Sequence, residues 1–437
     1  MTHTARVVVV FSTMALLLII VGVIQSWSVS LAILNLCLIS SIMALGINVQ
    51  WGYAGLFNAG IMGFAALGGV AAVLVSAAPV TEAWDAGGDG VLAALGVLIV
   101  TVGAIVFVRR KFRSEQLLRS VLTAVTFIAG FIVCRVIFSP AIEAIEAVEP
   151  AKTGFLGGFG LPIILSWVVG GAFAAGAAWV VGKVTLGLRS DYLAIATLGI
   201  SEIIVAILKN EDWLARGVKN VNGLPRPVPY EVDVQKSEFY QEIAAQLGFS
   251  IIEFSSLFVK LCYAGLFLIV LCIIFYLSEK ALRSPWGRMM RAIRDNEAAA
   301  SAMGKNVTGR HLQVFILGSA IIGIAGAMLT TLDGQFTPSS YQPLRFTFLI
   351  WVMVIVGGSG NNLGSIIGGF IIWFFWIEAE PLGLWFMDAL TAGMGDQNPL
   401  RLHLIASASH MRLIMMGLIL LLVLRFSPKG LLPERNR

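Results

Sequence analysis

Residues 7–24 read VVVVFSTMALLLIIVGVI, and residues 30–49 read SLAILNLCLISSIMALGINV. Neither run contains Lys, Arg, Asp or Glu, and only five residues separate the two. A helix that crosses the ~30 Å hydrocarbon core of a bilayer needs about 20 such residues. The two runs therefore predict a pair of membrane-spanning helices. Because no A-x-A-like cleavage site precedes Gln25, we expect 7–24 to be a retained anchor and not a secretory signal.

The composition extends this conclusion to the whole chain. Hydrophobic residues make up 58% of the 437 residues and charged residues 13%, against roughly 25% charged in soluble domains. These values exclude a soluble enzyme and the collagen-like, disordered and disulfide-rich secreted classes. We expect an all-α fold, a polytopic transmembrane helical bundle of about 12 spans (10–12). The expected spans are 7–24, 30–49, 54–76, 91–108, 118–138, 161–181, 192–208, 257–277, 312–331, 345–358, 363–379 and 411–426.

Basic residues are distributed unevenly between the expected loops. With the N-terminus inside, 19 of the 30 Lys and Arg residues fall on the inner side, many of them in 109–119, 278–311 and the tail 425–437. Acidic residues dominate the proposed outer loops at 82–89 and 143–149. The positive-inside rule therefore predicts that both termini are cytoplasmic. It also explains the net charge of +5 without a nucleic-acid partner.

One inner loop has the signature of a separate helix. Residues 284–304 read SPWGRMMRAIRDNEAAASAMG, with Ser284 as a good N-cap, Pro285 at the first helical position and Gly304 as a C-terminal stop. Arginines recur at every third position, at Arg288, Arg291 and Arg294, so the helix is too polar to cross the membrane. The pattern fits either a basic helix on anionic lipid headgroups or a docking helix for a cytoplasmic partner.

Four polar residues lie at membrane depth, namely Asn48, Gln50, Asn58 and Glu202. Asn48 and Asn58 flank the junction Trp51-Gly52-Tyr53, where two helices meet, and Glu202 lies well inside an apolar helix. An ionisable group at such depth is costly and usually faces the bundle interior or a water-filled cavity. A paired structural carboxylate is the alternative for Glu202, and hydrogen bonds between helices are the alternative for the asparagines.

Other polar motifs give no catalytic or metal chemistry. The loop GGSGNNLG (357–364) lacks the Lys-Ser/Thr pair of a P-loop, so we expect a tight turn between helices, and no Walker-type motif occurs elsewhere. The chain is therefore not expected to hydrolyse ATP itself. Buried, inert thiols are expected at Cys37, Cys134, Cys262 and Cys272. No metal site is expected from the four histidines, which are His3, His311, His403 and His410.

Five stretches occur in one order along the chain. They are ALGINVQWGYAGLFNAG (44–60), SDYLAIATLGISEII (190–204), GRMMRAIRDNEAAASAMGKNV (287–307), GGSGNNLGSIIGG (357–369) and FSPKGLLP (426–433). In order and wording they resemble the inner-membrane permeases of bacterial branched-chain amino-acid ABC importers, of the LivM type. The resemblance covers roughly 30–76 and 183–437.

The resemblance implies a transport subunit and not an enzyme. Such permeases lie in the bacterial inner membrane, pair with a second permease of the LivH type and receive substrate from a periplasmic binding protein. Two cytoplasmic ATPases bind ATP and Mg, so no cofactor is implied in this chain. The expected function is translocation of leucine, isoleucine or valine by alternating access.

The resemblance also assigns residues. The loop at 284–304 becomes an EAA-type coupling helix, with ATPase-coupling residues Arg291, Arg294, Asp295, Glu297, Ala298, Ala299 and Gly304. One departure is that the spacing from Glu297 to Gly304 is one residue longer than in other ABC importers. Candidates for lining the translocation path or supporting its gate are Asn48, Asn58 and Glu202.

The implied organisation has five parts. They are spans one to three (1–76), a probable inserted pair of spans (77–160), central spans with the outer loop 209–256 (161–283), the cytoplasmic coupling loop (284–311), and the last spans with the tail (312–437). The insertion and the sequence ARGVKNVNGLPRP in the outer loop depart from the family pattern.

Three alternatives to a branched-chain amino-acid permease remain open. Urea and short-chain amide permeases of the same superfamily have a similar pattern, so the cargo is not decided. A stand-alone secondary transporter would show inverted repeats and interrupted helices that converge on charges, and no repeat is visible. A scaffold role is conceivable for the extra pair of spans, 91–138.

Overall fold

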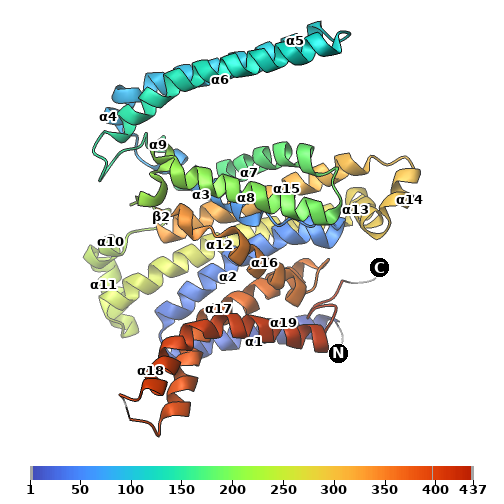
Figure 1. Cartoon of the computed structure of the whole chain (residues 1–437). Helices are drawn as coiled ribbons and strands as arrows, with labels where there is room; N and C mark the ends of the chain where they lie inside the picture. The colour runs from blue at the N-terminus through green and yellow to red at the C-terminus, as the bar shows by residue number, and fades with distance from the viewer. Residues whose placement is uncertain (1–2, 396, 435–437) are drawn as a thin grey trace.

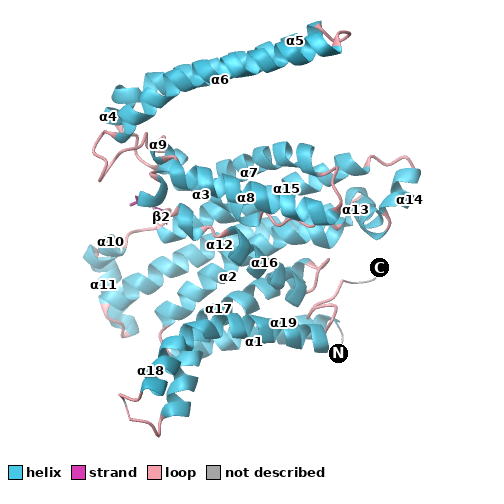
Figure 2. Cartoon of the chain, viewed as in Figure 1, coloured by secondary structure: helices cyan, strands magenta, loops and turns pink. Residues whose placement is uncertain are grey.

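The computed structural model describes residues 3–395 and 397–434, and most of them are helical (Figure 1; Figure 2). The predicted all-α membrane bundle is confirmed, with ten helices in the described part of the chain long and apolar enough to cross a membrane. Two residues counted in the basic tail, Arg435 and Arg437, lie outside the described residues.

The elements follow one another without a separate soluble unit. In chain order they are α1 His3–Ile24, α2 Trp27–Ile47, η1 Asn48–Gly52, α3 Ile61–Ser76, α4 Thr81–Ala83, η2 Trp84–Gly88, α5 Asp89–Lys111, α6 Gln116–Glu146, α7 Ile163–Thr185, α8 Ser190–Asn210, α9 Asp212–Ala215, η3 Gly217–Lys219, β1 Val221–Asn222, α10 Glu231–Lys236, α11 Glu238–Leu247, α12 Ile251–Arg283, α13 Pro285–Asp295, α14 Glu297–Ala302, α15 Val307–Asp333, β2 Gln335–Phe336, η4 Pro338–Ser340, α16 Pro343–Gly357, α17 Asn362–Thr391, α18 Pro399–Ala406, η5 Ser407–His410 and α19 Met411–Phe426.

A helix lies at each of the twelve expected spans, but α3 and α16 are shorter than a bilayer requires. α3 has 16 residues and α16 has 15. α19 has 16 residues as well, but it continues a helical run that begins at Pro399. The span expected at 54–76 begins only at Ile61, because residues 55–60 are non-helical and Gly55 has a φ of +71°. The junction expected near Trp51 is present as η1, a π-helical turn at the end of α2.

Small residues bring the central helices α3, α7 and α15 into backbone contact. A Cβ at Gly68 of α3 would lie 1.9 Å from the carbonyl oxygen of Gly323 on α15, and one at Gly326 would lie 2.0 Å from the carbonyl oxygen of Ala65. Close packing of this kind drives helix association where lipid removes the hydrophobic effect.

Different short elements lie at the two ends of the bundle. The start of α1 and the helices α13 and α14 lie at one end, while α10, α11, α18 and β2 lie at the other (Figure 1). At that second end β1 and β2 pair antiparallel, with Val221 opposite Phe336 and Asn222 opposite Gln335. The short strand pair ties the loop 209–256 to the segment that follows α15.

The helices α5 and α6 form a hairpin that stands apart from the bundle (Figure 1). Side chains along the hairpin are largely exposed, as expected of a pair surrounded by lipid. At its base, where the hairpin joins the rest of the chain, α6 contacts α9. Gly90 and Ala141 meet at its base, where a Cβ on Gly90 would lie 2.6 Å from that of Ala141. That residues 77–160 are an insertion stays a prediction.

Two local expectations were wrong. The single helix expected at 284–304 is two helices, α13 and α14, because Asn296 is extended (φ −156°, ψ 95°) and caps the second. The thiol of Cys272 is exposed on α12, whereas Cys37 is buried as expected and Cys134 and Cys262 are half-buried. An apolar run alone does not show which face of its helix points toward lipid.

Candidate functional site

α13 is fixed to the bundle by its apolar side. Ser284 caps the helix by accepting a hydrogen bond from the backbone N–H of Gly287 (3.4 Å), and Pro285 occupies the first turn. Met290 and Ile293 are 0% and 2% exposed, so this side of α13 belongs to the core. α13 is therefore packed as part of the bundle and is not a free surface helix.

α14 is presented to the surroundings. The side chain of Asn296 accepts from the backbone N–H of Ala299 (2.9 Å) and starts a second helix, which leads away from the bundle (Figure 1). Glu297, Ala298 and Ala299 are all exposed. Gly304 follows at a φ of +75°, where a residue with a Cβ would be strained. The result is a short exposed helix with small side chains on a fixed support.

Arg294 connects α13 to two other parts of the chain. It donates to the carbonyl oxygen of Gly52 in η1, and its Nη1 lies 2.9 Å from Oε2 of Glu434. Asp295, which is exposed, pairs with its Nε at 3.1 Å. Burial alone would lower the pKa of Arg294, but the hydrogen bonds and charges of Glu434 and Asp295 outweigh burial and raise that pKa. The guanidinium thus stays charged and holds the three segments together.

A buried polar network lies next to the contact between Arg294 and Gly52. The side-chain oxygen of Asn362 accepts from Asn48 Nδ2 (3.0 Å) and from the Tyr53 hydroxyl (2.9 Å), and its Nδ2 donates to Glu279 (3.0 Å). Asn48 also accepts from the backbone N–H of Gly360 (2.9 Å). The network joins α2, α12 and α17.

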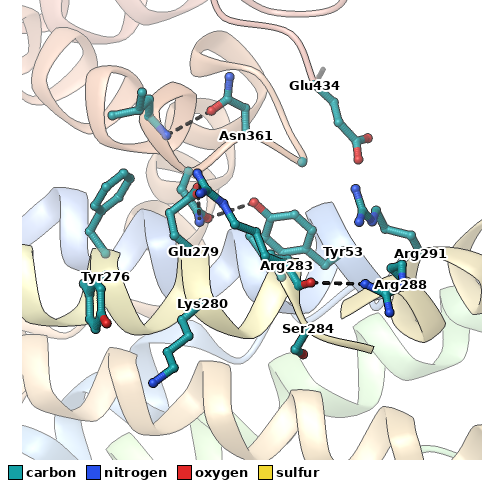
Figure 3. Close-up of a pocket in the computed structure, with 15 residues that line it drawn as sticks. Tyr53, Tyr276, Glu279, Lys280, Arg283, Ser284, Arg288, Arg291, Asn361 and Glu434 are labelled. Carbon is teal, nitrogen blue, oxygen red and sulfur yellow. Dashed lines mark hydrogen bonds and ion pairs between the residues drawn. The ribbon is translucent and has the colours of Figure 1, made fainter. Parts of the chain in front are cut away.

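The network borders a large cavity at the same end of the bundle. Its volume is about 950 Å³, and its wall combines the end of α12, the start of α13 and the turn between α16 and α17 (Figure 3). Lys280, Arg283, Arg288 and Arg291 lie around it, whereas Glu279 and Glu434 supply negative charge. Arg283 pairs with Glu279 at 3.1 Å. The cavity wall therefore carries both positive and negative side chains, and α13 forms part of it.

The chain end closes one side of this cavity. The backbone N–H groups of Leu431 and Leu432 donate to the carbonyl oxygens of Val356 (2.9 Å) and Gly357 (2.8 Å). The side chain of Asn361 donates to the carbonyl oxygen of Leu432 (3.1 Å). The turn at 357–364 is thus the tight turn that was expected, and it also holds the tail.

The structure places the predicted path residues in two different settings. Asn48 and Asn58 are 0% exposed, and Asn58 donates to Gln50 (2.9 Å) and accepts from the N–H of Gly60 (2.8 Å). Glu202 is exposed on α8 and has no hydrogen bond or ion pair within the described part of the chain. The asparagines thus shape the break between α2 and α3, while Glu202 lies on an outer surface.

Four residues of this site escaped the sequence analysis. They are Tyr53, Glu279, Glu434 and Asn362. Tyr53 and Asn362 lie within stretches that had been singled out, but their partners are distant in sequence. The available signal was the pair Asn361–Asn362 next to a membrane span, since two amides at that position need partners.

Comparison with known proteins identifies the family. The sequence profile of the branched-chain amino acid transport system / permease component family matches residues 29–424. The chain is 25% identical over 277 residues to the LivM protein of Salmonella typhimurium, a high-affinity branched-chain amino acid transport system permease, with 63% of this chain and 58% of that protein covered. No solved structure matches.

Two further relatives show how broad the similarity is. A probable branched-chain amino acid transport permease LivM from Methanocaldococcus jannaschii is 25% identical over 63% of this chain and 68% of its own. The xylose transport system permease XylH of Escherichia coli is 25% identical over 51% of this chain and 45% of its own. The matched profile covers far more than half of the chain. The chain therefore belongs to the branched-chain amino acid transport system / permease component family.

Proposed function

We propose that this chain is the LivM-type permease subunit of an ATP-driven ABC importer for leucine, isoleucine and valine. The observation that carries the proposal is α14, an exposed helix of small residues on a support that Arg294 ties to the core. Family membership and the similarity to LivM proteins support the cargo. The proposal places the chain in the inner membrane with both termini and α14 in the cytoplasm.

The proposed partners follow from this arrangement. A second, LivH-type permease completes the path, and two ATPases that bind ATP and Mg dock on α13 and α14. A periplasmic binding protein delivers substrate to the opposite end, where 209–256 is exposed. The similarity of a shorter stretch of the chain to a LivH protein fits a pair of related permeases.

Force from the ATPases reaches the spans through few contacts. Movement of α14 displaces α13, and Arg294 passes that movement to Gly52 in η1. η1 is the end of α2, so a shift there changes the angle between α2 and α3 at the non-helical residues 55–60. Asn48 and Asn58 act in this proposal as supports of the gate, and Glu202 faces either the path or the second permease.

Two other classes of substrate are alternatives to the branched-chain amino acids. Urea and short-chain amide permeases remain alternatives from the sequence, and the similarity to the xylose permease XylH adds a sugar. Uptake by the reconstituted complex, with leucine, urea and xylose in competition, separates the three. Leucine transport that only valine or isoleucine inhibits supports the proposal, whereas urea or xylose transport without leucine transport contradicts it.

The assembly is tested before the cargo. The chain is purified from its native membranes in mild detergent, and co-purifying proteins are identified by mass spectrometry. Two ATPases and a second permease support the proposal. A lone subunit or homo-oligomer in several detergents contradicts it and favours the secondary transporter instead.

A further inference from the structure

A second cavity lies toward the end of the bundle opposite α14, away from the coupling site. Its volume is about 270 Å³, and α2, α3, α15, α16 and α17 all contribute to its wall. At ~30 Å³ for each water, this space corresponds to about nine water molecules. A single amino acid, or another small solute of similar size, fits in this space.

Most of the wall is apolar. Ile39 and Met43 on α2, Met62 on α3 and Ile350 on α16 line it, and each is at most 5% exposed. Flexible methionines adapt to aliphatic groups of different shape. This part of the wall suits a branched aliphatic side chain. A sugar carries hydroxyl groups around its ring and would leave several of them without partners here.

The remaining wall has polar groups without partners. Asp333, the last residue of α15, lines the cavity, and its carboxylate makes no hydrogen bond or ion pair with any residue that the structure describes. In the same wall, Thr337 Oγ1 and Trp373 Nε1 are buried and lack partners among the described residues. Asp333 itself is exposed at the cavity wall. Buried polar groups are normally paired, so the two buried groups beside this unpaired carboxylate indicate a missing polar ligand.

The segment 334–341 covers the cavity on the outer side. Phe336 is 0% exposed, and the Tyr341 hydroxyl lies 2.8 Å from Thr330 Oγ1. A Cβ at Gly69 would lie 2.3 Å from the Tyr341 hydroxyl, so the segment sits directly on α3. The N–H of Leu224 donates to the carbonyl of Gly334 (3.1 Å), beside the β1–β2 pair. The cover is thus attached to the loop 209–256.

We propose that this cavity is a transient binding site for one zwitterionic amino acid with a branched aliphatic side chain. Asp333 receives the ammonium group, the hydroxyl of Thr337 and the indole N–H of Trp373 donate to the carboxylate, and Ile39, Met43, Met62 and Ile350 enclose the side chain. The choice of amino acid rests on the proposed function; the position of the site rests on the cavity alone.

The attachment of the cover gives the site a means of control. A protein that binds 209–256 pulls on β1, and β1 pulls on β2 and on 334–341. Docking of a binding protein therefore opens the cover from outside, and its release closes the cover over the bound amino acid. The site lies within one permease subunit and does not require the second permease to form its wall.

Photo-crosslinking tests the site directly. The full chain, purified with its partners and placed in lipid nanodiscs, is irradiated with a diazirine analogue of leucine, and labelled residues are identified by mass spectrometry. We expect the label on Met43, Met62 or Ile350, removed by excess leucine and retained in excess xylose or urea. Asp333→Asn removes the charge without changing size and should lower labelling at fixed ligand about ten-fold.

Two further variants make the result specific. Ser40→Leu fills the cavity from α2 and should also abolish labelling, while Asp89→Asn removes an exposed outer carboxylate on α5 and should leave labelling unchanged. Label outside the cavity in a complex that still imports leucine overturns the site and leaves the proposed function intact. Displacement by xylose or urea instead of leucine, without leucine uptake, overturns the proposed cargo and the amino-acid site together.

Discussion

Arg294 and Glu434 form an ion pair of 2.9 Å that joins the helix α13 to the end of the described chain. Both side chains are about one quarter exposed, so the pair contributes little to stability, about 1 kcal/mol or less. Its importance lies in position, because the same guanidinium also binds the carbonyl of Gly52.

Glu434→Gln should therefore reduce ATP-driven uptake several-fold while the melting temperature of the complex changes little. Uptake into proteoliposomes and thermal unfolding measure the two effects. Glu115→Gln, at an exposed loop tip on the same side, is the matched control and should transport normally. Equal uptake by Glu434→Gln and the wild type would show that the tail does not contribute to coupling.

Glu297→Ala should separate ATP hydrolysis from transport. The residue is exposed on α14, so the free energy of unfolding should change by no more than ~0.5 kcal/mol. We expect uptake to fall at least ten-fold while the complex still hydrolyses ATP, because the ATPases lose a contact through which they move the permease. Ser301→Ala on the same helix is the control. Uptake at the wild-type rate by Glu297→Ala would refute the coupling role of this residue.

Asn362→Ala should destabilise the chain by about 2 kcal/mol or more, because it leaves Glu279, Asn48 and Tyr53 each short of a hydrogen-bond partner. In the Asn362→Ala background, Asn48→Ala should lower the free energy of unfolding by less than it does in the wild type, since both residues belong to one network. Thermal unfolding in detergent measures both variants. Asn210→Ala, which loses only an exposed bond to its own helix, should be nearly neutral; an equal loss there would argue against the network.

Gly68→Ala should disrupt the packing of α3 on α15, because the added methyl group would meet the carbonyl of Gly323. We expect a loss of about 3 kcal/mol, at the upper end for overpacked cores, or failure to accumulate in the membrane. Gly176→Ala on α7 has no atom within 4 Å of the new Cβ and should be neutral or slightly stabilising. Expression level and melting temperature compare the two.

Deletion of 91–138 tests the proposed insertion. Gly90 and Ala141 are already in contact, so a short Gly-Ser link can join the cut ends without strain. The shortened chain should still assemble and import leucine, because the hairpin stands apart from the bundle. Assembly without uptake would assign these two helices a part in transport.

The sequence was sufficient for the class of fold and the positions of the helices, because apolar length is a local property. It also marked Ser284 as a cap, which depends only on neighbouring residues. It did not predict the break at Asn296, where a side chain competes with the helix for backbone N–H groups. Nor did it find Glu279 or Glu434, since their partners Asn362 and Arg294 lie far away along the chain.

The short helices α3 and α16 have a consequence for permeation. At 1.5 Å per residue, their 16 and 15 residues extend about 24 and 22 Å, less than the ~30 Å of hydrocarbon around the protein. The irregular backbone at 55–60 is partly covered by protein, because Leu56, Asn58 and Gly60 are buried while Gly55 and Phe57 are exposed. We therefore expect the apolar barrier along these two helices to be thinner than the surrounding bilayer, so that a smaller movement admits water there than along the longer spans.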